Sequence, residues 1–155
     1  MKIRPAKASE AKQIVEELWL PLAREMEETA EINELSDNLD KDDLVEWRED
    51  KIESNDPTLV AEHEDELIGL ITATEDSPAP IFSRGDYLKI NDIYIKPDYR
   101  RKGYATQLLD RIEEEARERG FESVELEVDT ANNSAKELYR NEGFETRRER
   151  MIKEL

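Results

Sequence analysis

Cysteine is absent from this chain of 155 residues, and histidine occurs only once. Without cysteine the chain has no disulfide framework, no thiolate metal ligand and no cysteine nucleophile. Any acyl or phosphoryl transfer must therefore proceed without a thiol intermediate. His63 lies beside acidic residues at a predicted hairpin tip, where we expect a surface side chain, and no cluster of ligand residues suggests a metal.

Positive charge is also scarce, since 23 basic residues face 40 acidic ones and the formal net charge is −17. Nucleic acids and anionic membranes attract basic surfaces, so we expect neither as a main partner. Charged residues reach 41%, against about 25% in an average protein. At about 1 M salt the Debye length is only ~3 Å, so self-repulsion would be screened. The composition favours a solvated acidic shell suited to a halophilic cell with a salt-rich cytosol and an acidic proteome.

Long apolar runs are missing too. No stretch approaches the ~20 apolar residues that span a bilayer, and residues 1–5 lack the apolar core of a signal peptide. We therefore expect a cytoplasmic protein. The length suits one compact domain over residues 1–155, and we find no internal repeat, heptad seam or linker.

The first half of the chain predicts two helices and four strands. Ser9 can cap a helix with apolar residues up to Leu22, although Pro21 should kink or end it. Another helix should follow Asp40 and stop at residues 55–57. The predicted strands cover residues 3–4, 58–63, 67–74 and 87–95, and the middle two form a hairpin with an acidic tip.

Sharper patterns mark the second half. Apolar residues at helical spacing over 105–116 predict a helix ended by Gly120. Residues 121–129 alternate as in a strand, 134–142 suit a short helix, and 144–152 supply a final strand. The order β-α-α-β-β-β-α-β-α-β indicates one α/β domain.

Three cations stand together at Arg100, Arg101 and Lys102, directly before Gly103 and the helix that follows. Unpaired N–H groups and the positive end of the dipole make a helix N-terminus a site for phosphate or pyrophosphate. Gly103 would let the backbone approach such a ligand closely. A solvated basic turn is the alternative.

Residues 95–105 resemble the acetyl-CoA signature of the GNAT superfamily of N-acetyltransferases, Arg/Gln-x-x-Gly-x-Gly/Ala after a hydrophobic strand. Residues 132–144 resemble its second signature, Asn-x-x-Ala-x-x-Leu-Tyr-x-x-x-Gly-Phe. Both occur in order, joined by a helix and a strand of suitable length. The resemblance implies a GNAT fold with a central mixed, mostly antiparallel sheet, about four flanking helices, and acetyl-CoA as cosubstrate without a metal.

The same resemblance implies roles for individual residues. The CoA pyrophosphate would lie on the backbone of the loop and helix start, and the pantetheine arm would pair with the strand and contact Asn132. The implied cofactor-binding residues are Ile93, Ile95, Arg100, Arg101, Lys102, Gly103, Tyr104, Ala105 and Asn132. Tyr139 would protonate the departing thiolate, which suits a phenol that is neutral at pH 7.

The general base remains open. Asn91 stands where polyamine acetyltransferases carry a glutamate, and an amide is not a useful base. Residues 126–132 resemble the ribosomal-protein N-terminal alanine acetyltransferases, in which a glutamate at the place of Glu127 is the base. We weigh Glu127, Asp92 and a chain of waters.

The acceptor is a primary amine of a class that we leave open: a small amine or polyamine, an amino acid, or a protein N-terminus. Trp19 and Trp47 lie on helices that border the acceptor site in this family, but we expect them to be packed inside. Because Asn91 replaces the glutamate, a CoA-binding sensor with impaired catalysis is the alternative function. A homodimer is compatible with the sequence.

Overall fold

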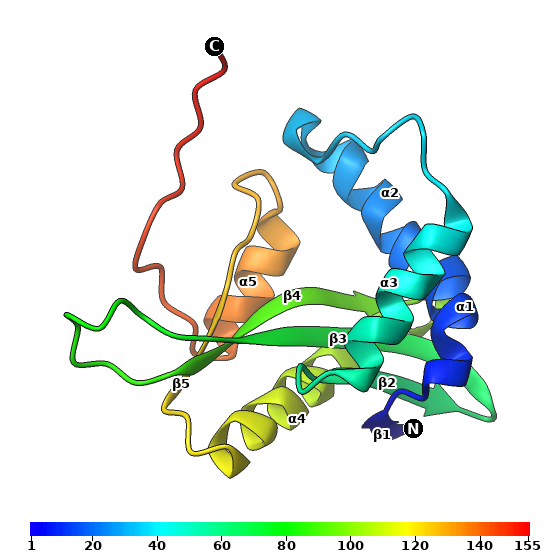
Figure 1. The fold of residues 1–155 in the computed structure, drawn as a ribbon, viewed down its shortest axis with the longest axis horizontal. Helices are drawn as coiled ribbons and strands as arrows, with labels where there is room; N and C mark the ends of the chain where they lie inside the picture. The colour runs from blue at the N-terminus through cyan, green and yellow to red at the C-terminus, as the bar shows by residue number, and fades with distance from the viewer.

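A five-stranded sheet forms the centre of the computed structural model, which describes residues 1–155 (Figure 1). Across the sheet the strands follow the chain order: β1 (Lys2–Pro5), β2 (Thr58–His63), β3 (Glu66–Asp76), β4 (Tyr87–Ile95) and β5 (Ser123–Leu126). The first four strands pair antiparallel, whereas β4 and β5 are parallel. The predicted mixed, mostly antiparallel sheet is confirmed.

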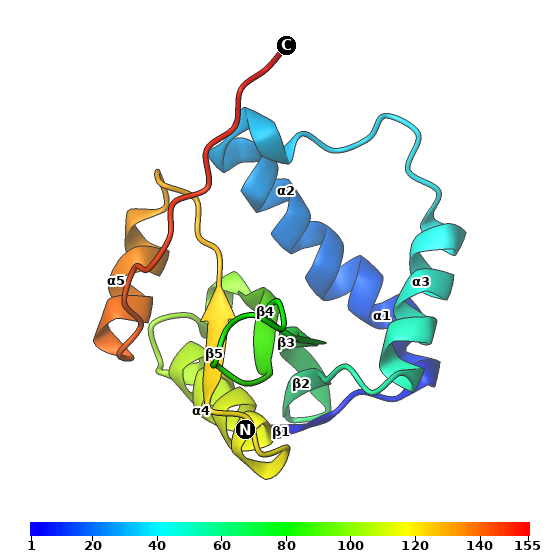
Figure 2. The ribbon, with the colours of Figure 1, turned by 60° about the vertical axis from the view of Figure 1, so that its left-hand side comes forward.

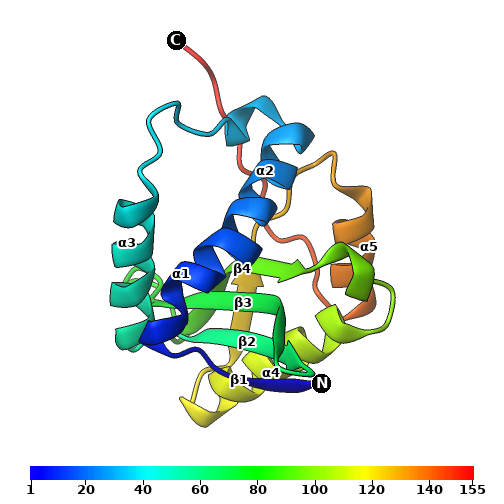
Figure 3. The ribbon, with the colours of Figure 1, turned by 90° about the vertical axis from the view of Figure 1, so that its right-hand side faces the viewer.

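Helices cover both faces of this sheet (Figure 3). They are α1 (Ala11–Ile14), α2 (Leu20–Thr29), α3 (Lys41–Glu53), α4 (Tyr104–Glu118) and α5 (Asn133–Asn141), with short 3-10 turns at Ala8–Glu10, Glu31–Asn33 and Pro97–Tyr99. Asp40 caps α3 by accepting hydrogen bonds from the backbone N–H groups of Asp42 and Asp43. None of these helices is both long and apolar enough to cross a membrane.

Two apolar clusters hold these layers together. Leu108, Leu109 and Ile112 of α4 pack on one face of the sheet, where Leu138 and Tyr139 of α5 join them. On the opposite face, a smaller cluster joins α1 and the π turn after it to the sheet; its buried members are Ile14, Leu18, Val60, Leu67, Leu70 and Tyr94. The neighbours α1, α2 and α3 therefore share one side of the sheet, and α4 and α5 the other (Figures 1 and 2).

Pro21 does not end the first helical segment, which continues through this residue. A π turn over Val15–Trp19 joins α1 to α2, and the N–H of Leu20 bonds to the carbonyl of Val15. Because proline has no N–H, a helix has to lose one backbone bond at this place. The wider turn absorbs that loss, and α2 continues to Thr29.

The final strand predicted at 144–152 is wrong, because these residues form neither strand nor helix (Figure 1). Residues 145–150 are all polar or charged, so they offer no apolar face to bury against the sheet. Met151 and Ile152 are 89% and 57% exposed. The strand predicted over 121–129 is shortened to Ser123–Leu126.

Candidate active site

The strands β4 and β5 separate halfway along the sheet. Their parallel pairing runs from Tyr87 with Ser123 to Ile90 with Leu126; β4 then continues to Ile95 paired only with β3. At the same point β4 has a bulge, because Asp92 pairs with Thr72 and Ile90 with the next residue of β3. Asn91 is therefore the extra residue, located where the two strands part.

Beyond the bulge, one edge of β4 lacks a neighbouring strand. The N–H of Lys96 bonds to the carbonyl of Ile68, and hydrogen-bonded residues alternate in an antiparallel ladder. The backbone groups of Ile93 and Ile95 therefore point away from β3, toward the open edge. This arrangement leaves room for an extended ligand to pair with β4. The Ile95 carbonyl already accepts a hydrogen bond from Arg100 Nε at 2.8 Å.

A tight loop leads from this edge to the start of α4. Arg101 and Gly103 have positive φ values of 61° and 80°, and Gly103 is the N-cap residue of the helix. Arg101, Lys102 and Gly103 are exposed. The first N–H groups of the 15-residue helix, from Tyr104 onward, have no intrahelical acceptor. The loop and the helix start thus offer donors and positive charge to an anion.

Arg100 differs from its two cationic neighbours because its side chain forms an ion pair and a hydrogen bond with other residues of the protein. Its Nη2 atom lies 2.7 Å from Glu25 Oε1, and its guanidinium lies 5.3 Å from the centre of the Tyr94 ring. Lys102 rests 5.6 Å from the Tyr99 ring. Arg100 therefore links α2 to the open edge of β4.

Tyr139 lies on α5, half buried against the apolar cluster of α4. Its ring meets that of Phe144 edge-on, with centroids 5.8 Å apart. Burial raises the pKa of the Tyr139 phenol above its ordinary value of 10.0, so the phenol stays protonated through the neutral pH range. Asn132 caps the start of the same helix, because its side chain accepts a hydrogen bond from the N–H of Ala135.

The two carboxylates considered as bases have different surroundings. Glu127 is exposed and lies 3.2 Å from both Lys89 and Arg150. The hydrogen bond from Lys89 is the largest cause that lowers the pKa of Glu127. Asp92 accepts a 2.6 Å hydrogen bond from Thr72, on the face of the sheet toward Arg48 of α3. Asn91 donates a 2.6 Å hydrogen bond to Thr74.

A cavity of about 330 Å³ lies between α3 and the sheet, on the same face as Asp92. Its sheet side is polar, its helix side is aromatic and basic, and the loop between them adds Asp56; the lining includes Trp19, Trp47, Arg48, Lys51, Asp56, Thr72, Thr74, Asn91 and Asp92. The rings of Trp19 and Trp47 stack at 5.1 Å. The expectation that both are interior residues is wrong for Trp47, which is 46% exposed.

Sequence reasoning missed Arg48. This residue is only 1% exposed, its guanidinium lies 4.3 Å from the Trp19 ring centre, and its Nη2 atom is 3.7 Å from Asp92. Neither Nε nor Nη2 has a hydrogen-bond partner. Burial lowers the pKa of Arg48, and the charge of Asp92 partly offsets this effect. Helical spacing could have found it, because Arg48 falls four residues after Leu44 and four before Ile52 on the apolar stripe.

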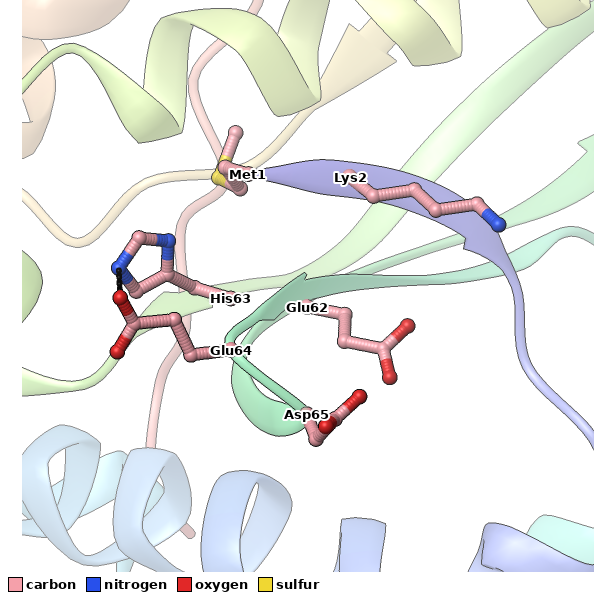
Figure 4. A pocket seen from close by; sticks show the side chains of 6 residues that line it. All are labelled: Met1, Lys2, Glu62, His63, Glu64 and Asp65. Carbon is pink, nitrogen blue, oxygen red and sulfur yellow. Dashed lines mark ion pairs between the residues drawn. The ribbon is translucent and has the colours of Figure 1, made fainter.

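Another cavity, of about 480 Å³, lies at the far edge of the sheet beside the β2–β3 hairpin (Figure 4). It is lined by Met1, Lys2 and residues 62–65, with His63 Nε2 3.8 Å from Glu64 Oε1. None of the residues implied in acetyl transfer lines it. No group of three or more potential ligand side chains in the protein is arranged to hold a metal ion.

Comparison with known proteins shows the family to which the sequence is similar. Residues 15–144 match the acetyltransferase (GNAT) family. An uncharacterized N-acetyltransferase of Methanocaldococcus jannaschii, MJ1207, is 40% identical over 57 residues, which are 37% of this chain. That match covers only 25% of the length of the M. jannaschii protein.

Solved structures share the fold. A protein from Clostridium acetobutylicum described as a predicted acetyltransferase, solved with acetyl-CoA, superposes with a TM-score of 0.75 at 21% identity, covering 99% of this chain and 95% of that one. A ribosomal-protein-alanine N-acetyltransferase from Brucella melitensis biovar Abortus 2308 has a TM-score of 0.71 at 17% identity, with both chains fully covered. The family match covers most of this chain, and the structure adds the open edge of β4 and an α4 that begins after a glycine. This chain therefore belongs to the GNAT acetyltransferase family.

Proposed function

We propose that this protein transfers the acetyl group of acetyl-CoA directly to a primary amine. The observation that carries the proposal is the parting of β4 and β5 beside the N-terminus of α4. The open backbone edge at Ile93 and Ile95 suits an extended pantetheine arm. The donors from Arg101 to Ala105 suit the pyrophosphate, with Arg100, Lys102 and Asn132 close to the same path.

Acetyl-CoA supplies an activated thioester, and the protein's own residues supply position and proton transfer. The neutral amine attacks the thioester carbonyl, a C–N bond forms and the C–S bond breaks. The phenol of Tyr139 gives its proton to the departing thiolate and regains one from water. A backbone N–H at the β4 bulge is a suitable donor to the oxyanion.

Asp92 is our first choice for the group that removes the amine proton, directly or through water. Both carboxylates have a cation within 4 Å, but Asp92 lines the cavity that adjoins the bulge, whereas Glu127 is exposed and does not line it. Asp92→Asn should lower kcat/KM at neutral pH more than Glu127→Gln does. The reverse order would assign the role to Glu127, and two equally active variants would favour a chain of waters.

Initial rates at several concentrations of acetyl-CoA and an amine test direct transfer. A sequential mechanism gives intersecting double-reciprocal lines. Parallel lines together with an isolated acetylated protein would overturn it, because they indicate an acyl-enzyme. CoA binding without any turnover would support the alternative of a sensor with impaired catalysis.

A further inference from the structure

Arg48 is a buried cation whose hydrogen-bonding capacity is largely unused. It lies on the inner stripe of α3 and is 1% exposed, yet neither Nε nor Nη2 has a hydrogen-bond partner. Its nearest carboxylate, Asp92, is 3.7 Å away and is already bonded to Thr72. Buried donors in native proteins nearly always have partners, so this guanidinium requires an explanation.

The surroundings of Arg48 favour a ligand as the missing partner. Arg48 lines the cavity between α3 and the sheet together with Lys51, whose Nζ lies 5.5 Å from the Trp47 ring. Both cations are on the helix side. A guanidinium presents its N–H groups as a planar fork that matches the two oxygens of a carboxylate.

The same cavity reaches the place of acetyl transfer. Its sheet side includes Asn91 and Asp92, which come directly after the last paired residue of β4 and β5. Asp92 Oδ2 lies only 3.7 Å from Arg48 Nη2, so a ligand that binds Arg48 through a carboxylate would hold an adjacent amine beside Asp92 and Asn91. These two polar groups are a carboxylate and an amide, which suit an ammonium or amine.

We propose that this cavity selects acceptors that carry a carboxylate near the amine, so that free amino acids are the substrate class. Arg48 binds the carboxylate, and Asp92 faces the amine. This inference rests on the proposed acetyl transfer. Asp56 also lines the cavity and lies 3.4 Å from Lys51, so Arg48 is the cation left for the carboxylate of a ligand. The strongly acidic exterior therefore does not decide the acceptor's charge.

Matched acceptors test the proposal on the unmodified protein. Each set holds an amino acid, its carboxamide and the amine without the carboxyl group: L-lysine, L-lysinamide and cadaverine, or L-phenylalanine, L-phenylalaninamide and phenethylamine. A lost charge-assisted contact corresponds to about a 10- to 100-fold change. We expect kcat/KM for the best amino acid to exceed that for its carboxamide by this factor. Equal or higher values for the carboxamide and amine would overturn the proposal.

Substitutions then assign the preference to one residue. Arg48→Met should reduce the ratio of amino acid to carboxamide to near one, and Arg48→Lys should restore part of it. Arg117→Met is the matched control, because it removes the same charge from an exposed position on α4, across the sheet from the cavity. A ratio that changes equally in the control, or persists in Arg48→Met, contradicts a carboxylate site at Arg48.

A binding assay separates this inference from the proposed catalysis. The chain has only two tryptophans, and both line the cavity. Tryptophan fluorescence should therefore respond to L-lysine or L-alanine, more strongly than to the carboxamide, and the response should be lost in Arg48→Met. If no amine is acetylated but this response is seen, the carboxylate site stands and the acetyl-transfer proposal fails. If amines are acetylated without preference or response, only the carboxylate site is refuted.

Discussion

Replacing Tyr139 with phenylalanine removes a single oxygen and retains the ring. The ring makes the contacts that matter for packing, with its centroid 5.8 Å from that of Phe144 and its side chain against the α4 cluster. We therefore expect the free energy of unfolding of Tyr139→Phe to stay within about 1 kcal/mol of the parent. The loss should appear in the chemical step instead.

The size of that loss follows from the acid role. General acid catalysis contributes about 10²- to 10⁴-fold, equivalent to about 3–5 kcal/mol of transition-state stabilisation. We expect kcat to fall by this factor while the Kd for CoA changes less than about threefold. Because burial raises the Tyr139 pKa above 10.0, the parent should lose activity through this residue only as the pH rises beyond that value.

Thiol release under single-turnover conditions, with the enzyme in excess over acetyl-CoA and with saturating amine, measures the step directly. Tyr87→Phe is the control, since it also removes a phenol oxygen, one bonded to Asp76 at 3.2 Å at the start of β4. The reasoning is refuted if Tyr139→Phe keeps its turnover within about threefold between pH 6 and 9. It is also refuted if the control loses as much activity.

Other predictions concern stability and cofactor binding. In Gly69→Ala the new Cβ would lie 3.0 Å from the Tyr94 carbonyl, so urea unfolding should show a loss of about 1–3 kcal/mol, and an unchanged midpoint would contradict this. Glu10 accepts two hydrogen bonds from Arg4, which lower its pKa; its stabilisation is therefore present at pH 7 and lost as the pH falls through the folded-state value. Glu10→Gln should thus cost about 1–2 kcal/mol at pH 7 and progressively less as the pH falls below 4.5, whereas a cost that does not fall with pH would be inconsistent. Arg100→Ala should weaken CoA binding by about 1.5–3 kcal/mol, and parent affinity should hold or improve up to molar KCl. A steep monotonic fall with KCl and no effect of the variant would contradict both.

Local patterns predicted much of the fold. The apolar stripe of α4, the acidic hairpin tip and the two glycine-containing signatures are each contained within a short segment, so their structure follows from nearby residues. The strand predicted after Phe144 is wrong, because a strand needs an apolar face to bury and residues 145–150 have none.

The cavity could not be predicted from local patterns, because the residues that form it are far apart in the sequence. Arg48 and Asp92 are 44 positions apart in the sequence, and only the packing of α3 on β4 brings them within 3.7 Å. The bulge at Asn91 likewise depends on the register between β3 and β4. The cofactor loop and Tyr139 could be proposed from short sequence motifs, whereas the features that bear on the acceptor depend on tertiary packing.

Product analysis tests the central claim most directly. The purified protein is incubated with acetyl-CoA and, separately, with amino acids, polyamines and short peptides that have free N-termini. Free thiol is quantified, and products are identified by mass spectrometry. We predict an N-acetylated product, equimolar with released CoA, for at least one amine. CoA binding without any acetylated product across the panel would contradict the claim that this chain is an N-acetyltransferase.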